Sequence, residues 1–225
     1  ADIAHVIYLD HRGCGRSTGA PETWTLDTWA DDLAAFLEAH DITAPWVFGQ
    51  SFGGMVAMHF AARHPQHVSK LILSSTAARF DVEATVAKAT DLGGSKAGAA
   101  ARRLFTDPTP EAYAHYADIC LPLYSQTPAA DAFRAKAIHR PEVTVHFFAN
   151  EMKKMDLRPG LATLTMPTLV LAGAEDPVTP TPCARQIAQA RGPEAQLHIF
   201  EGCGHGPHRD KPDETAEVMR AFLLG

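Results

Sequence analysis

The sequence has few cysteines, no long apolar run and no excess of basic residues, and each of these features excludes a class of protein. The 225 residues carry a formal net charge of −6 and their basic residues form no cluster, so we expect no nucleic-acid partner. No stretch reaches the roughly 20 apolar residues that a membrane span requires, so we expect no membrane partner either. The 46% hydrophobic and 20% charged residues are ordinary for a globular protein.

The cysteines and the twelve histidines lack the spacing of a disulfide framework or a structural metal site. The cysteines are interpreted as reduced thiols of a cytoplasmic protein: Cys14, Cys120, Cys183 and Cys203. A secreted protein whose leader has been removed is the alternative. Two histidine pairs at a spacing of three could each share a metal: His64 with His67, and His205 with His208. Neither pair belongs to an H-E-x-x-H motif, so we expect no metal and no cofactor.

Short apolar runs alternate with helical patterns along the chain. This alternation is typical of an α/β fold with a mostly parallel sheet flanked by helices. We expect strands at residues 5–9, 46–48, 70–73, 168–171 and 196–200. Apolar residues recur at helical spacing over residues 28–40, and a closing helix is expected at residues 213–224.

Residues 79–164 interrupt the alternation. They contain helical patterns at residues 82–92, 99–105, 110–121 and 129–138, separated by Gly93-Gly94 and by several prolines. No strand of the parallel set is evident among them. We therefore expect a helical cap at residues 79–164, inserted into a core formed by residues 1–78 and 165–225.

The most informative motif is G-x-S-x-G at residues 49–53, directly behind the apolar run at 46–48. A strand that ends in this motif and continues into a helix is typical of the nucleophile elbow of serine hydrolases. Ser51 is then the nucleophile, and the backbone N–H of Phe52 supports an oxyanion at the helix start. Gly49 and Gly53 are expected to be small because side chains there would clash. A glycine-rich packing turn is the structural alternative.

A serine nucleophile needs a base, and the base needs an orienting acid. Asp176 and His205 follow the fourth and fifth expected strands, at the sheet edge where catalytic groups collect. Glu175 is the rival acid, but we favour Asp176 because the following proline fits a loop that turns its carboxylate inward. His208 is the rival base, but His205 is flanked by glycines that let its loop reach the serine.

Taken together, the elbow, the acid, the histidine and their order resemble the α/β-hydrolase fold with a cap. The loop from Leu9 to Ser17 resembles the proline iminopeptidase branch (peptidase family S33-like), whose members carry a similar D-x-R-G-C-G-x-S motif. The segment Gly-Cys-Gly-His that ends at His205 also fits that branch. The resemblance implies that Asp10 and Arg12 brace this loop.

Two features depart from that branch. Its members usually carry tryptophan after the nucleophile, where this chain has Phe52. They also hold the substrate's amino group with cap glutamates, and Thr144 stands at one expected glutamate, with Glu142 and Glu151 nearby. We predict Phe147, Phe148 and Glu151 as substrate-binding residues.

In the family, several strands and a His-Gly-rich loop precede the strand expected at residues 5–9, and one of those strands lies between it and the strand at 46–48. Without that strand, two neighbours would be separated by two spacings of about 4.8 Å with unpaired backbone. We therefore expect the sequence to be a fragment whose N-terminal strands and second oxyanion donor are omitted or carried on another chain.

The predicted function is that of a serine hydrolase that forms an acyl-enzyme on a small ester, amide or N-terminal peptide bond. The expected partner is a small molecule or short peptide, and the sequence does not indicate an oligomeric state. One alternative is a lactone, ester or carbon–carbon bond hydrolase with the same three residues. Another is a non-catalytic ligand-binding protein on this fold.

Overall fold

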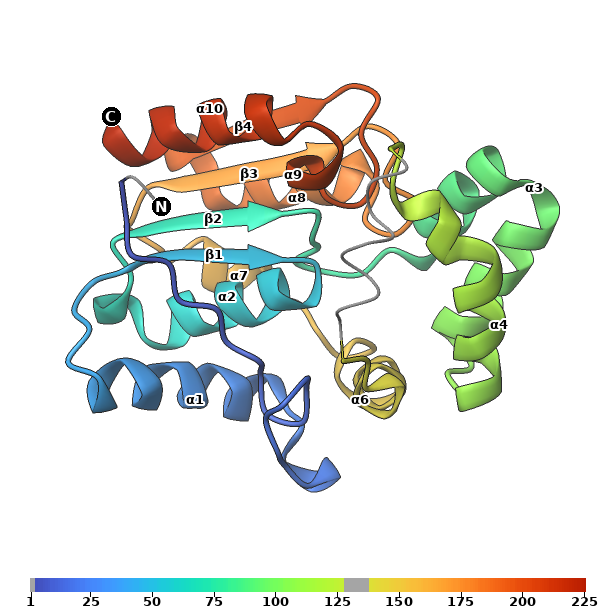
Figure 1. The fold of residues 1–225 in the computed structure, drawn as a ribbon, viewed down its shortest axis with the longest axis horizontal. Helices are drawn as coiled ribbons and strands as arrows, with labels where there is room; N and C mark the ends of the chain where they lie inside the picture. Colours follow the sequence, from blue (N-terminus) through green and yellow to red (C-terminus); the bar gives the residue numbers. More distant parts are fainter. Residues whose placement is uncertain (1–2, 128–137) are drawn as a thin grey trace.

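A four-stranded parallel sheet forms the centre of the computed structural model, which describes residues 3–127 and 138–225. The strands lie in the order β1-β2-β3-β4, and their arrowheads point toward the same edge (Figure 1). Gly49 pairs with Leu73, Leu73 with Val170 and Val170 with Leu197. The strand bounds are β1 (Trp46–Gln50), β2 (Lys70–Ser74), β3 (Thr168–Gly173) and β4 (Ala195–Phe200).

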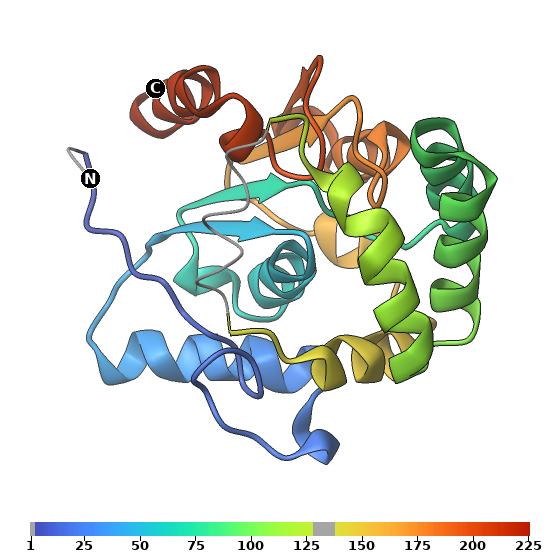
Figure 2. The ribbon, with the colours of Figure 1, turned by 45° about the vertical axis from the view of Figure 1, so that its right-hand side comes forward.

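Helices cover both faces of the sheet and a further group lies beyond the carboxyl ends of the strands (Figures 1 and 2). The α-helices are α1 (Leu26–Ala39), α2 (Phe52–Arg63), α3 (Val82–Thr106), α4 (Pro110–Cys120), α6 (Pro141–His146), α7 (Arg158–Leu161), α8 (Thr181–Arg191), α9 (Pro207–Asp210) and α10 (Pro212–Leu224). Short 3-10 turns are η1 (Pro21–Thr23), η2 (Pro65–His67), η3 (Leu121–Tyr124) and η6 (Gly192–Glu194), and η5 (Phe147–Glu151) is a π-helical turn. No helix in the described ranges is both long and apolar enough to cross a bilayer.

The alternation of side chains along each strand divides the core into two layers. Leu71 and Leu73 join the larger cluster with the helices α1, α2 and α8. Ile72 and Leu171 point to the opposite face and pack with Phe222 of α10. The sheet is therefore buried on both sides, as parallel sheets require.

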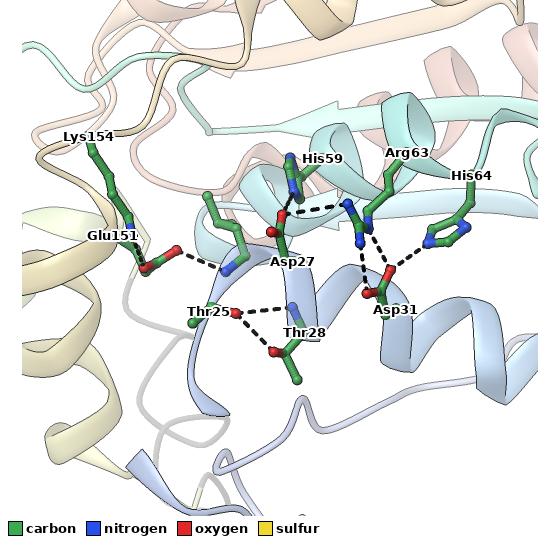
Figure 3. Close-up of polar contacts among 10 residues, drawn as sticks. Thr25, Asp27, Thr28, Asp31, His59, Arg63, His64, Glu151 and Lys154 are labelled. Atoms are coloured by element: carbon green, nitrogen blue, oxygen red, sulfur yellow. Dashed lines mark hydrogen bonds and ion pairs between the residues drawn. The ribbon is translucent and has the colours of Figure 1, made fainter. Parts of the chain in front are cut away.

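Polar contacts join α1 to α2 (Figure 3). Asp27 accepts a contact from His59 at 2.6 Å, and Asp31 bonds Arg63 at 2.6 Å and His64 at 2.7 Å. The hydrogen bonds from Arg63 and His64 lower the pKa of Asp31 to about 2. The side chains of Arg63 and Asp31 are 43% and 47% exposed, so solvent screens their charges and the pair contributes little to stability.

The four strands expected from residue 46 onward are confirmed, but the strand expected at residues 5–9 is wrong. Residues 5–10 have no strand partner among the described residues and run outside the sheet (Figures 1 and 2). Tyr8 is 92% exposed, and Val6, Ile7 and Leu9 are exposed as well. An apolar run becomes a strand only where a neighbour satisfies its backbone groups, and this segment has none.

Helices fill the described part of residues 79–164, and no strand interrupts them. α3 kinks at Gly94, where φ is +74° and ψ is −175°, close to the helix break expected at the glycine pair. Of the helix expected at residues 129–138, residues 129–137 lie outside the described residues. α3 and α4 stand beyond the carboxyl ends of the strands (Figure 1).

Candidate active site

Ser51 lies on a sharp turn between β1 and α2. Its φ of +53° and ψ of −122° are rare for a non-glycine residue and store strain of about 1–3 kcal/mol. The Ser51 N–H donates to Ser74 O at 3.0 Å, and the Thr76 hydroxyl donates to Ser51 O at 2.7 Å, so both neighbours hold the turn. The predicted strand-to-helix elbow is present.

Close packing at the elbow explains why residue 49 is a glycine. A Cβ on Gly49 would lie 2.5 Å from the Gly53 carbonyl oxygen, so no larger residue fits. The expected clash at Gly53 is wrong, because nothing lies closer than 3.9 Å to its Cβ position. The second close approach is instead at Gly54, where a Cβ would lie 2.6 Å from Thr76.

Asp176 and His205 form a buried pair. The His205 Nδ1 lies 2.9 Å from Asp176 Oδ2, and the two residues are 4% and 0% exposed. The carboxylate also accepts the N–H groups of Val178 at 2.8 Å and Thr179 at 2.9 Å, and the Thr179 hydroxyl at 2.9 Å. Burial alone would raise the pKa of Asp176, but His205 and these donors hold it below its ordinary value. The acid is therefore charged at neutral pH.

The rival acid and the rival base occupy other environments. Glu175 bonds Lys88 of α3 at 2.7 Å and so joins the helical segment to the loop after β3. His208 lies against Phe48, with ring centroids 6.2 Å apart. Burial lowers the pKa of His208 to about 4.

The backbone of His205 is held from several sides. Its N–H donates to Tyr124 O at 2.7 Å, and its carbonyl accepts Gln50 Nε2 at 3.1 Å and a guanidinium N–H of Arg209. The Tyr124 ring lies edge-on to the imidazole, with centroids 4.9 Å apart. Because Gln50 precedes Ser51, its hydrogen bond ties the elbow directly to the histidine loop.

A cavity of about 330 Å³ opens between the sheet edge and the helices. Ser51 and His205 both line it, and most of its wall is aromatic or aliphatic. The apolar wall includes Phe52, Met55, Phe80, Leu104, Tyr113, Tyr116, Val143, Phe147 and Phe148. No Asp or Glu is among the described residues that line the cavity. The lining also includes the basic residue Arg140, so the space suits a largely apolar molecule that carries no positive charge.

Phe147 and Phe148, which the sequence predicts as substrate-binding residues, both line the cavity. Phe147 is 2% exposed and packs edge-on against Phe52 with centroids 5.0 Å apart. Phe52 is the first residue of α2, so its N–H has no acceptor within the helix. That orphan donor suits the predicted oxyanion role.

Glu151 does not line the cavity, although it was predicted to bind substrate. Its carboxylate accepts the Leu26 N–H at 3.0 Å and lies 2.7 Å from Lys154 Nζ (Figure 3). Glu151 is the last residue of the π-helical turn, in which the Met152 N–H bonds the Phe147 carbonyl five residues back. Its carboxylate is held by α1 and Lys154 and is not available to a molecule in the cavity.

The loop at residues 9–17 is braced by the residues that the family resemblance singles out. Asp10 Oδ2 accepts the Arg16 N–H at 3.0 Å, and Arg12 pairs with Asp32 of α1 at 2.5 Å. The loop places Cys14 against the cavity. Neither charged side chain lines that cavity, so both act on the loop's shape.

Sequence reasoning missed several groups around the histidine. Thr179 lies three residues after the acid, and Gln50 adjoins the nucleophile, so proximity in sequence could have suggested both. Tyr124 and Asp210 reach the histidine loop through tertiary contacts that no local pattern marks. Within the described ranges, no cluster of three or more His, Cys, Asp or Glu side chains is placed to hold a metal.

The chain is similar in sequence to known hydrolases. The family model for the alpha/beta hydrolase fold matches residues 1–212. The chain is 28% identical over 228 residues to RutD of Caulobacter vibrioides, which is named as a proposed carbamate hydrolase, covering 98% of this chain and 80% of that protein. It is 27% identical over 246 residues to a proline iminopeptidase of Lactobacillus crispatus, covering 99% and 81%.

Solved structures share the fold. An alpha/beta fold family hydrolase from Bacillus anthracis superimposes with a TM-score of 0.74 at 22% identity, over 95% of this chain and 80% of that one. The enol-lactonase of Burkholderia xenovorans gives a TM-score of 0.71 at 22% identity, over 96% and 79%. Both superpositions extend over the sheet and the helical segment described above.

Proposed function

Because the chain belongs to the α/β hydrolase fold family, we propose that it is a serine hydrolase in which Ser51, His205 and Asp176 act as a catalytic triad. One observation carries the proposal. The buried Asp176–His205 pair opens onto the same cavity as the strained turn that presents Ser51. A protein that only bound its ligand would have no need of all three groups.

The contacts of the buried pair support a separate role for each group. Asp176 is charged and accepts from His205 Nδ1–H, which leaves Nε2 unprotonated and able to take the proton of the Ser51 hydroxyl. The serine oxygen then attacks the substrate carbonyl, and the N–H of Phe52 stabilises the oxyanion. His205 returns the proton to the leaving group, and water hydrolyses the acyl-enzyme by the same route.

The lining of the cavity favours a small, largely apolar ester or lactone without a positive charge. A volume of about 330 Å³ accepts a compact molecule, and the aromatic wall favours an apolar acyl group. The free amino group of a peptide would need a carboxylate, and no Asp or Glu lines the described part of the cavity. An amide or N-terminal peptide bond is therefore a weaker candidate, although an iminopeptidase is among the relatives. Residues 79–164 would act as the cap.

A fluorophosphonate probe tests the nucleophile. The wild-type protein should gain one adduct on Ser51, and Ser51→Ala should gain none. Ser95→Ala, on the exposed side of α3, is the matched control and should label like the wild type. Absence of an adduct on folded wild-type protein would refute the triad and favour a binding protein.

Turnover tests the substrate class. Wild-type protein should cleave p-nitrophenyl acetate or butyrate, and Ser51→Ala should lose at least about 10³-fold in kcat. Proline naphthylamide should be cleaved far more slowly than the esters. Faster cleavage of the naphthylamide would overturn the ester proposal while leaving the triad intact.

A further inference from the structure

Asp210, the last residue of α9, gathers hydrogen bonds from two separate parts of the chain. Its Oδ2 accepts the Gly204 N–H of the histidine loop at 2.7 Å. Its Oδ1 accepts three donors from the segment that follows η3: Ser125 Oγ at 2.5 Å, Gln126 N at 3.0 Å and Thr127 Oγ1 at 3.1 Å. We call residues 124–127 the strap. One carboxylate thus joins the strap to the loop that carries His205.

The strap lies directly against that loop. The Tyr124 carbonyl accepts the His205 N–H at 2.7 Å, and its ring packs on the imidazole. A Cβ on Gly204 would lie 2.4 Å from Tyr124 O, so the two backbones are as close as glycine allows. A shift of the strap would therefore move the histidine.

A charged Asp210 side chain suits the contact between the strap and the histidine loop. Burial would raise its pKa, but Ser125 and the backbone N–H groups of Gly204 and Gln126 outweigh burial and hold the pKa below its ordinary value. Hydrogen bonds to an ionised carboxylate are shorter and stronger than neutral ones. Asparagine at this position would keep one acceptor oxygen and turn two N–H donors toward groups that are themselves donors.

We propose that Asp210 is a positioning residue that orients His205 by fastening the strap to the histidine loop. It does not line the cavity among the described residues, so it acts through His205 and not on the substrate. The proposal rests on the proposed function, because it assigns His205 the role of base. The helical segment would then position the catalytic base through the strap, in addition to covering the cavity.

The test compares Asp210→Asn with Asp213→Asn. Asp213 is exposed on the first turn of α10, three residues further on. Misplacing a catalytic group by about 1 Å can cost about 100-fold, so Asp210→Asn should lower kcat for p-nitrophenyl butyrate by about 10- to 100-fold. KM should change less than about threefold because the cavity lining is untouched. Asp213→Asn should retain wild-type kcat and KM.

A second readout does not depend on turnover. The proton on His205 Nδ1, hydrogen-bonded to Asp176, should give a low-field proton resonance in wild type and in Asp213→Asn. This resonance should shift or broaden in Asp210→Asn while the melting temperature stays near that of the wild type. If the wild-type protein shows no Ser51-dependent turnover, the proposed function fails, and the resonance alone still decides the role of Asp210.

Three results would overturn the proposal. An unchanged kcat and an unchanged resonance would show that His205 does not depend on Asp210. A rise in KM alone would place the effect on the cavity. If Asp210→Asn does not fold, the double variant Ser125→Ala/Thr127→Val removes two strap donors and keeps the Gly204 contact. A wild-type kcat and resonance in that double variant would refute the strap's role.

Discussion

Replacing Thr179 with valine should lower the free energy of unfolding by about 1.5–3 kcal/mol at neutral pH. The Thr179 hydroxyl donates to Asp176 Oδ2 at 2.9 Å, and both residues are almost fully buried. Valine has nearly the same shape, so the change opens no cavity. It removes one charge-assisted donor from a carboxylate that water cannot reach. The remaining donors, Val178 N–H, Thr179 N–H and His205, stay in place.

The pH dependence of that loss identifies its cause. The folded-state pKa of Asp176 is depressed, so its contribution is present above the unfolded value of about 3.9 and is lost as pH falls through the folded value. Removing a donor raises the folded pKa of Asp176 toward its ordinary value. The deficit of the valine variant should therefore be constant at pH values well above about 3.9 and should shrink as pH falls toward and below that value.

Urea denaturation at a series of pH values measures this deficit. Thr179→Ser is the matched control, because it keeps the hydroxyl and loses a buried methyl group worth about 1 kcal/mol. The deficit of the serine variant should not change with pH. A valine variant within 0.5 kcal/mol of wild type at neutral pH, or one whose deficit is the same at every pH, would refute the reasoning.

Two further predictions concern α1. Glu151→Ala should cost about 1–3 kcal/mol, because it leaves the buried Leu26 N–H without its acceptor and frees Lys154; a thermal melt indistinguishable from wild type would contradict this. Asp31→Asn should cost less than about 1 kcal/mol despite the pKa of about 2, because the carboxylate and Arg63 are nearly half exposed. The Asp31 effect should fade in 0.5 M salt, and it should fade as pH falls from about 4 to about 2, between the unfolded and folded pKa values; an effect that persists in salt would count against a surface pair.

The sheet was predictable wherever an apolar run has at least one neighbouring strand. Leu71 and Val170 belong to such runs, and both are buried in paired strands. The run around Tyr8 is equally apolar but has no neighbouring strand, and its composition does not reveal that difference. Strand prediction therefore succeeded for the four paired strands and failed for the segment outside the sheet.

The candidate site was predictable where one physical rule links position to chemistry. Ser51, Asp176 and His205 follow strand ends, so parallel topology alone is enough to bring their loops to one edge. Glu151 was suggested only by its position near Thr144, and that prediction was wrong because its carboxylate bonds the Leu26 N–H and Lys154. Asp210 was missed because its Ser125, Gln126 and Thr127 partners lie more than 80 residues away, and no local pattern reports such contacts.

The π-helical turn at Phe147–Glu151 lets the cavity wall hold one residue more than an α-helical turn would. Deleting one residue there would restore the α-helical hydrogen-bond spacing and leave the segment beyond the turn in nearly its present rotational phase. The length of this one turn can therefore change without turning the following segment over, which makes it a compact target for library design.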